Sequence, residues 1–152
     1  MKKLLVGLTV MLASFAALAD QAQVNFSSNV ASYCTVGQIA PGVMHLNGTN
    51  VTTDTSAIVA VNSNEGGIYK IEVANPSGFT SVPADYTGTA VLTSNFAVTG
   101  ANQSVGDVIA GQSFNLDNAG DNTVSVTIAG TADQPVVAGN YSTTAIAACI
   151  AQ

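Results

Sequence analysis

The sequence predicts an all-β protein built from antiparallel strands. Short runs of alternating apolar and polar residues recur along the chain, and turn-forming residues separate them. Gly, Thr, Ser, Asn, Val and Ala dominate the composition, whereas the strong helix formers Glu, Lys, Arg and Gln are scarce. After the first residues no apolar period typical of a helix persists. These observations favour sheets joined by tight turns.

The alternating runs place the expected strands in order along the chain. They lie at residues 20–37, 43–47, 57–63, 67–75, 89–100, 112–117, 122–130 and 141–151. Roughly seven or eight strands, at spacings of about ten to fifteen residues, match an immunoglobulin-like β-sandwich. Asn75-Pro76-Ser77-Gly78 and Asn64-Glu65-Gly66-Gly67 have turn chemistry, and the second is expected to close a hairpin.

The opening and closing runs differ in the size of their apolar side chains. The first run carries Val24 and Phe26 at alternate positions and pauses at Ser28. The clearest strand, 122–130, turns Val124, Val126 and Ile128 to one face. In the last run the alternation gives two faces, and both contain small residues. Ile146, Ala148 and Ile150 lie on one face, and Ala145, Ala147 and Cys149 lie on the other.

The first nineteen residues have the pattern of a secretory signal peptide. Lys2 and Lys3 form a basic start, residues 4–15 an apolar stretch, and Ala17-Leu18-Ala19 a small-residue cleavage site. The apolar stretch is too short to span a bilayer. Cleavage after Ala19 would leave 152 − 19 = 133 residues, so we expect a single exported domain over residues 20–152.

The expected mature chain is strongly acidic. It keeps Lys70 as its one basic residue against nine acids, which gives a formal charge of 1 − 9 = −8. Nucleic acids and anionic lipids are bound through clusters of Lys and Arg. We therefore expect neither as a partner. No later run reaches 18 apolar residues, so no membrane insertion is expected.

The two cysteines, Cys34 and Cys149, would meet an oxidising compartment after export, where a disulfide persists. One intramolecular pairing is available, and it would tie the first strand to the last. The alternative is two free or intermolecular thiols.

No motif in the sequence predicts an enzyme, a cofactor or a metal site. The single histidine, His45, lies in a predicted strand without a partner motif. The run Asp117–Asn122 offers two carboxylates and two amides, yet its spacing matches no calcium loop and its residues are ordinary turn formers. We therefore expect a turn at 117–122 and a non-catalytic protein.

Both ends of the chain resemble the exported subunits of chaperone–usher pili, in particular the archaic type with its spore-coat-protein-U-like domains. An alternating strand with Val24, Phe26 and Val30 leads to Cys34-Thr35-Val36-Gly37, and Gly139-Asn140-Tyr141 leads into the final strand. This chain departs from the family pattern in the position of its second cysteine, which lies in the last strand and not in the middle of the chain.

The resemblance implies a mechanism. Such subunits lack the last strand of their sandwich, and the N-terminal strand of a neighbouring subunit fills the gap by β-strand addition. Here residues 20–31 would be the donor strand, with Ala22, Val24, Phe26 and Val30 as plugs. The implied partners are copies of the chain or related subunits, a periplasmic chaperone and an outer-membrane usher. The implied product is a surface fibre or coat that supports adhesion or biofilm formation.

Two alternatives stay open at this stage. The opening strand could pair within its own sheet, which would leave no gap to fill. The protein would then be a self-contained secreted β-sandwich, and its polar faces rich in Asn, Thr and Ser would suit a glycan or a matrix component. Against glycan binding, the chain has no Trp and only four Tyr to stack on sugar rings.

Overall fold

A computed structural model describes residues 23–152 of the chain. The predicted signal peptide and the predicted plug Ala22 lie outside the described residues. Residues 31–152 form one compact unit, and residues 23–30 belong to a separate unit that ends at Val30. Residues 23–30 have no regular secondary structure. The predicted strand at 20–37 therefore differs from the structure, in which the ladder begins only at Cys34.

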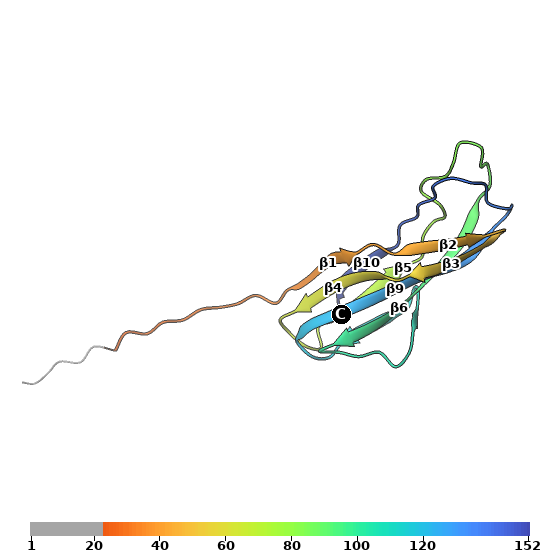
Figure 1. Cartoon of the computed structure of the whole chain (residues 1–152). Coiled ribbons are helices and arrows are strands. Elements are labelled where there is room, and N and C mark those ends of the chain that lie inside the picture. Colours follow the sequence, from red (N-terminus) through yellow and green to blue (C-terminus); the bar gives the residue numbers. More distant parts are fainter. Residues whose placement is uncertain (1–22) are drawn as a thin grey trace, which may run out of the picture. The chain divides into compact units, whose positions relative to one another are not determined.

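The described residues confirm the predicted all-β class. They form ten strands and no helix, arranged as two antiparallel sheets in the manner of a β-sandwich (Figure 1). The strands are β1 (Cys34–Ala40), β2 (Val43–Asn47), β3 (Asn50–Thr55), β4 (Ala57–Ser63), β5 (Tyr69–Ala74), β6 (Ala90–Gly100), β7 (Val108–Ile109), β8 (Ser113–Leu116), β9 (Gly120–Ala132) and β10 (Ile146–Ala151).

A long bent hairpin forms one side of the larger sheet. β1 and β2 lie one after the other along the edge. β1 pairs with β4, and β2 pairs with β3. The edge is interrupted at Pro41-Gly42. Pro41 has no backbone N–H to donate. Gly42 lies so close to the start of β4 that a Cβ atom on it would be 2.9 Å from Ala57 N. The hairpin reverses through Gly48-Thr49, between paired Asn47 and Asn50. Gly48 has φ of 62°, as a glycine at the first position of a two-residue turn allows.

β9 is the central strand of the larger sheet. On one side β9 pairs with β4 over Ala57–Ser63 and, further along, with β3. On the other side it pairs with β6 over eleven positions, from Ala90 to Gly100. β7 adds a short rung beyond β6. The predicted face of Val124 and Val126 is buried in the core. β-branched side chains at alternate positions thus fix the register of this sheet.

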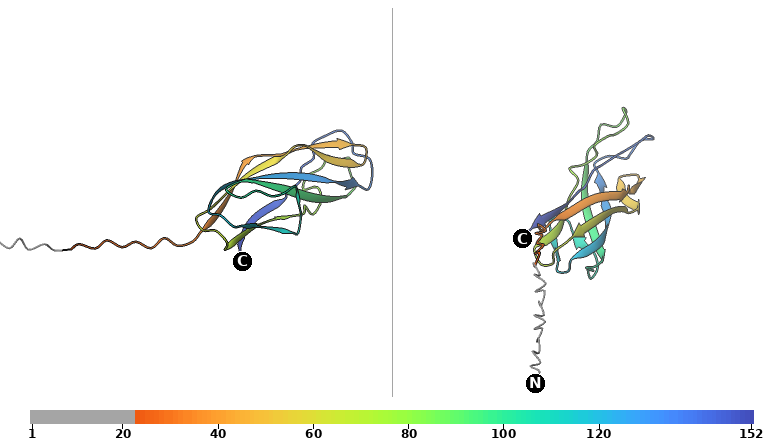
Figure 2. Two further views of the ribbon diagram at one scale, coloured as in Figure 1. Left: turned by 90° about the horizontal axis from the view of Figure 1, so that it is seen from below. Right: turned by 90° about the vertical axis from the view of Figure 1, so that its left-hand side faces the viewer.

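The smaller sheet has the order β10–β5–β8 and covers the larger sheet (Figure 2). Ile71 and Val73 of β5 point into the core, while Lys70 and Glu72 lie on the opposite face and form an ion pair with an Nζ–Oε1 distance of 2.8 Å. In β10 the small set faces the core: Ala147 and Cys149 pack against it, as does Ala145 just before the strand. The larger Ile146 points outward and is exposed.

Three further details differ from the sequence predictions, and the first is the two-residue strand β7, which was not predicted. β3 was not predicted, because only Val51 of its residues is fully buried and the rest of the strand is polar. The segment Asn64–Gly67 does not close a hairpin. It carries the chain from β4 in the larger sheet across to β5 in the smaller sheet.

The segments 76–89 and 133–145 project together from one end of the unit (Figure 2). An isolated bridge joins Ser81 to Ser142. Phe79, Tyr86 and Tyr141 pack on one another with ring centroids 5.1 to 6.1 Å apart. These contacts hold the chain that leads into β10 in place. Among residues 23–152, no helix is long and apolar enough to cross a membrane.

Candidate functional site

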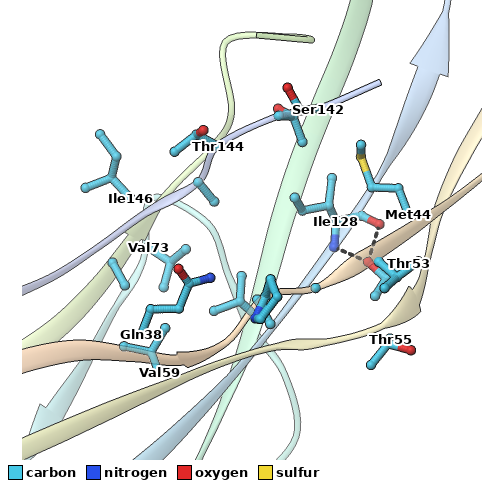
Figure 3. Close-up of a pocket in the computed structure, with 18 of the residues that line it drawn as sticks. Gln38, Met44, Thr53, Thr55, Val59, Val73, Ile128, Ser142, Thr144 and Ile146 are labelled. Carbon is cyan, nitrogen blue, oxygen red and sulfur yellow. Dashed lines mark hydrogen bonds between the residues drawn. The ribbon is translucent and has the colours of Figure 1, made fainter. Parts of the chain in front are cut away.

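A groove of about 820 Å³ runs along one side of the unit. One wall is the edge formed by β1 and β2, from Val36 to Leu46, and the other is the C-terminal segment from Gly139 to Ala147. Figure 3 shows side chains of both walls, with Gln38 and Met44 from the first and Ser142 and Thr144 from the second. The groove therefore lies between the first and last strands of the unit.

The first wall of the groove is a sheet edge, and the second wall leads into one at Ile146 and Ala147. β1 pairs only with β4, and β2 only with β3, so the larger sheet ends there. β10 pairs only with β5, so the smaller sheet ends there as well. An edge strand presents a row of unpaired backbone N–H and C=O groups, which can pair with another chain. The groove thus offers one such row along β1 and β2, and the start of a second row where β10 begins.

The floor of the groove is the hydrophobic core. Val59, Val73 and Val126 line the groove and are buried members of the core cluster. Ala57, Ile128 and Leu46 continue the apolar lining. Ala145 and Ala147 face this floor from the second wall, and their methyl groups leave space that larger side chains would fill. An apolar side chain entering the groove would be packed against the core.

No charged residue lines the groove, and several of its polar groups already have partners within the unit. Thr53 Oγ1 donates to Ile128 O at 2.8 Å and accepts from Ile128 N at 2.5 Å. Thr143 Oγ1 donates to Gly78 O at 2.6 Å, and the hydroxyl oxygens of Ser142 and Thr80 lie 3.0 Å apart. The lining therefore favours an uncharged occupant that supplies its own backbone hydrogen bonds.

The predicted disulfide between Cys34 and Cys149 is confirmed, and it closes one end of the groove. It joins β1 to β10 with a Cα–Cα distance of 6.2 Å. A strand placed between two others needs about 9.5 Å, which is twice the usual spacing between strands. No third strand fits between Cys34 and Cys149, so an extended occupant must end before this point.

The predicted plugs Val24, Phe26 and Val30 are exposed, with 73%, 93% and 74% of their surfaces accessible. They belong to the unit that ends at Val30. The sequence predicted this segment and the disulfide, and the family resemblance implied an unfilled gap, but the residues that line the groove were not predicted. The run of alanines before Cys149 was a sequence signal for its second wall.

The other sequence candidates form no site in the described residues. His45 is exposed on β2, and no group of three His, Cys, Asp or Glu side chains in residues 23–152 could hold a metal ion. In the run 117–122, Asn118 and Asn122 are bound to Asn102, with Asn122 Oδ1 accepting from Asn102 N at 2.8 Å. Their amides brace a turn.

Tyr86, next to the aromatic cluster, is buried, and its hydroxyl has no hydrogen-bond partner in the described structure. Burial raises the pKa of this phenol, and the nearby Asp133 carboxylate and Tyr141 add to the effect. Asp133 accepts hydrogen bonds from Thr89 N at 2.9 Å and Thr89 Oγ1 at 2.8 Å, which lower the pKa of its carboxyl group. These residues tie the two projecting segments together.

No protein-family model, curated protein or solved structure matches this chain. The function is therefore argued from the groove and from the sequence of the segment that precedes β1.

Proposed function

We propose that this protein is a structural subunit of an exported surface fibre, a pilus or coat, that polymerises by donor-strand exchange. The observation that carries the proposal is the groove between the unpaired edge of β1–β2 and the segment that leads into β10, above an apolar floor. Such a groove is what remains when a sandwich lacks one strand. A strand added there would complete both sheets through main-chain hydrogen bonds.

The occupant we propose is the segment 20–31 of a second copy or of a related subunit. Its length of 31 − 20 + 1 = 12 residues matches the first wall, which spans 46 − 36 + 1 = 11 residues. Val24, Phe26 and Val30 alternate with polar residues, so one face of the extended segment is apolar. Burying these three side chains would contribute on the order of 5–8 kcal/mol before ordering costs.

The proposed contact is head-to-tail. The donor strand precedes β1, whereas the acceptor groove lies along β1 and β2, so the two surfaces differ and the contact propagates into a fibre. An unfilled groove exposes edge strands that would promote aggregation. A periplasmic chaperone is therefore the expected first occupant, and an outer-membrane usher the expected site of exchange. The fibre would support adhesion or biofilm formation.

The proposal is tested by changing Phe26 and its neighbour separately. Phe26→Asp places a charge on the apolar face of the donor strand, and Asn25→Asp places the same charge on the opposite face. We expect Phe26→Asp to abolish heat- and detergent-resistant ladders while chaperone binding is retained. Asn25→Asp should polymerise normally.

Polymers that form at the normal rate with Phe26→Asp would contradict the plug assignment. A wild-type chain that refolds unaided, stays monomeric and takes up no segment would favour the self-contained binding module. Phe79, Tyr86 and Tyr141 pack on one another, which leaves Tyr33 as an exposed aromatic side chain for such a module.

A further inference from the structure

Asn64 binds the backbone of the residues that connect the donor segment to β1. Tyr33 N donates to Asn64 Oδ1 at 2.7 Å, and Asn64 Nδ2 donates to Ala31 O at 3.0 Å. Asn64 N also donates to Tyr33 O at 3.3 Å. Asn64 thus binds both ends of the stretch from Ala31 to Tyr33. All of these contacts lie within the compact unit.

The side chain of Asn64 replaces a strand that has turned away. β4 ends at Ser63, where Ser63 Oγ donates to Glu65 O at 2.6 Å and begins the crossing to the smaller sheet. Beyond Ser63 the backbone makes one more bond, from Asn64 N to Tyr33 O, and then turns away from residues 31–33. The Asn64 amide offers one donor and one acceptor, as a backbone rung would. The path of β1 is therefore extended backwards as far as Ala31.

We propose that Asn64 is a positioning residue that keeps the donor segment out of its own groove, so that the groove stays open to a second copy. This inference rests on the proposed function. Self-insertion would require the segment to reverse direction and run antiparallel to the free edge of β1. The point at which it can reverse decides which plugs reach the groove, because the register of a hairpin is set by its turn.

With residues 31–33 held by Asn64, the turn must come before Ala31. A three-residue turn at 28–30 pairs Ser27 with Ala31, so paired residue numbers sum to 27 + 31 = 58. Phe26 then lies opposite Ser32, outside the groove, whose wall begins at Val36. Val24 would lie opposite Cys34, since 24 + 34 = 58, and no third strand fits beside the disulfide there, so no plug reaches the groove. The segment gains almost no apolar burial in its own groove.

Without the Asn64 contacts the turn can move into the stretch before β1. A loop over 29–35 passes around the disulfide and pairs Ser28 with Val36, so paired numbers sum to 64. Phe26 then lies opposite Gln38, inside the groove, and Val24 lies opposite Ala40. The even-numbered plugs face the same side as Val36, because directly opposed residues share a face. Self-insertion then becomes a competitor of exchange.

The test uses the mature chain with a labelled synthetic peptide of residues 20–31, at chain concentrations too low for exchange between copies. Asn64→Ala is compared with the matched control Asn62→Ala. The control removes a side-chain hydrogen bond at the same end of β4, from Asn62 Nδ2 to Asp121 Oδ1 at 2.5 Å. Both substitutions are repeated in a Phe26→Asp background, whose own segment cannot compete. Amide hydrogen exchange at Tyr33 is followed in parallel.

We expect Asn64→Ala to weaken the apparent affinity for the peptide about tenfold, which corresponds to a groove that is self-filled about nine-tenths of the time. Asn62→Ala should have no such effect, and Asn64→Ala should have none in the Phe26→Asp background. Exchange at the Tyr33 amide should accelerate only with Asn64→Ala. This pattern would support the positioning role.

Three results would overturn it. Equal affinities for the Asn64→Ala and Asn62→Ala chains would remove the role of Asn64 and leave the proposed function intact. Equal weakening in the Phe26→Asp background would indicate damage to the groove and not release of the segment. A peptide that binds no variant, including the unsubstituted chain, would remove the proposed function and this inference with it.

Discussion

Cys34 and Cys149 join the edge of one sheet to the edge of the other at the closed end of the groove, 115 residues apart in sequence. The bond holds β1 and β10 together where no hydrogen-bonded ladder connects them. In the chain-entropy model a closed loop of this length stabilises the folded state by about 4–5 kcal/mol.

We therefore expect the double substitution Cys34→Ala with Cys149→Ala to lower the free energy of unfolding by about 4–5 kcal/mol, measured by urea denaturation without reductant. Reductant should destabilise the unsubstituted chain by a similar amount and leave the double variant unchanged. A loss below about 1 kcal/mol would show that the folded unit does not depend on this link.

Ala147 and Ala148 are neighbours on β10 that serve as a matched pair for the groove. Ala147 lines the groove, whereas Ala148 lies on the other face of the strand. Ala147→Leu should fill the space that we assign to a plug and weaken binding of the peptide 20–31 by at least about tenfold, or 1.4 kcal/mol. Ala148→Leu should leave binding unchanged. Equal affinities in a fluorescence titration would place the peptide elsewhere on the protein.

The buried hydroxyl of Tyr86 has no hydrogen-bond partner in the described structure, so the desolvation of this group opposes folding. Tyr86→Phe keeps the ring contacts to Phe79 and Tyr141 and removes the hydroxyl. We expect the free energy of unfolding to rise by about 1 kcal/mol. Thermal denaturation tests this, with Tyr141→Phe as the comparison. The Tyr141 hydroxyl donates to Val137 O at 3.1 Å, so its removal should destabilise the folded protein. A destabilised Tyr86→Phe would reveal a partner for the hydroxyl.

The Asp133 carboxylate accepts two hydrogen bonds from Thr89, and they lower the pKa of its carboxyl group from the usual value of 3.8. A group with a lowered pKa in the folded state stabilises that state above its unfolded pKa, and the contribution is lost as the pH falls through the folded pKa. The difference in melting temperature between the unsubstituted chain and Asp133→Ala should be constant from pH 7 to about 4 and shrink at lower pH. Asp85→Ala, an exposed carboxylate of the facing segment, is the control. A difference that grows below pH 4 would reverse the assigned sign.

The sequence predicted most strands because Val and Ile alternate with polar residues where a face is buried, as at Val124 and Val126. It failed where that contrast is weak. In β3 only Val51 is fully buried, and the signal that could have found this hairpin was Gly48, since glycine is typical of the first position of a two-residue hairpin turn. The crossing at Asn64–Gly67 had the composition of a hairpin turn, and composition does not say which sheet receives the next strand.

The family resemblance implied a gap, but the residues that line the groove could not be predicted because its walls are distant in the sequence. Val36 and Ala147 meet only after both sheets have formed. The alanines before Cys149 indicated a poorly packed strand, and the structure gives the physical reason: the small face of β10 points inward and leaves space. The contacts of Asn64 with residues 31–33 likewise depend on where β4 ends, which alternation alone does not fix.

Lys70 is the only lysine or arginine after residue 3, and it lies on β5 in an ion pair with Glu72. Trypsin cleaves after these two residue types, so the chain after residue 3 offers this protease a single site, within the central strand of the smaller sheet. A cut there would separate a piece carrying Cys34 from a piece carrying Cys149, and the disulfide would still hold the two together. Digestion should therefore proceed only as fast as the domain unfolds, and should become visible on a gel only after reduction. A fibre of such units would withstand a protease that degrades most of the proteins around it.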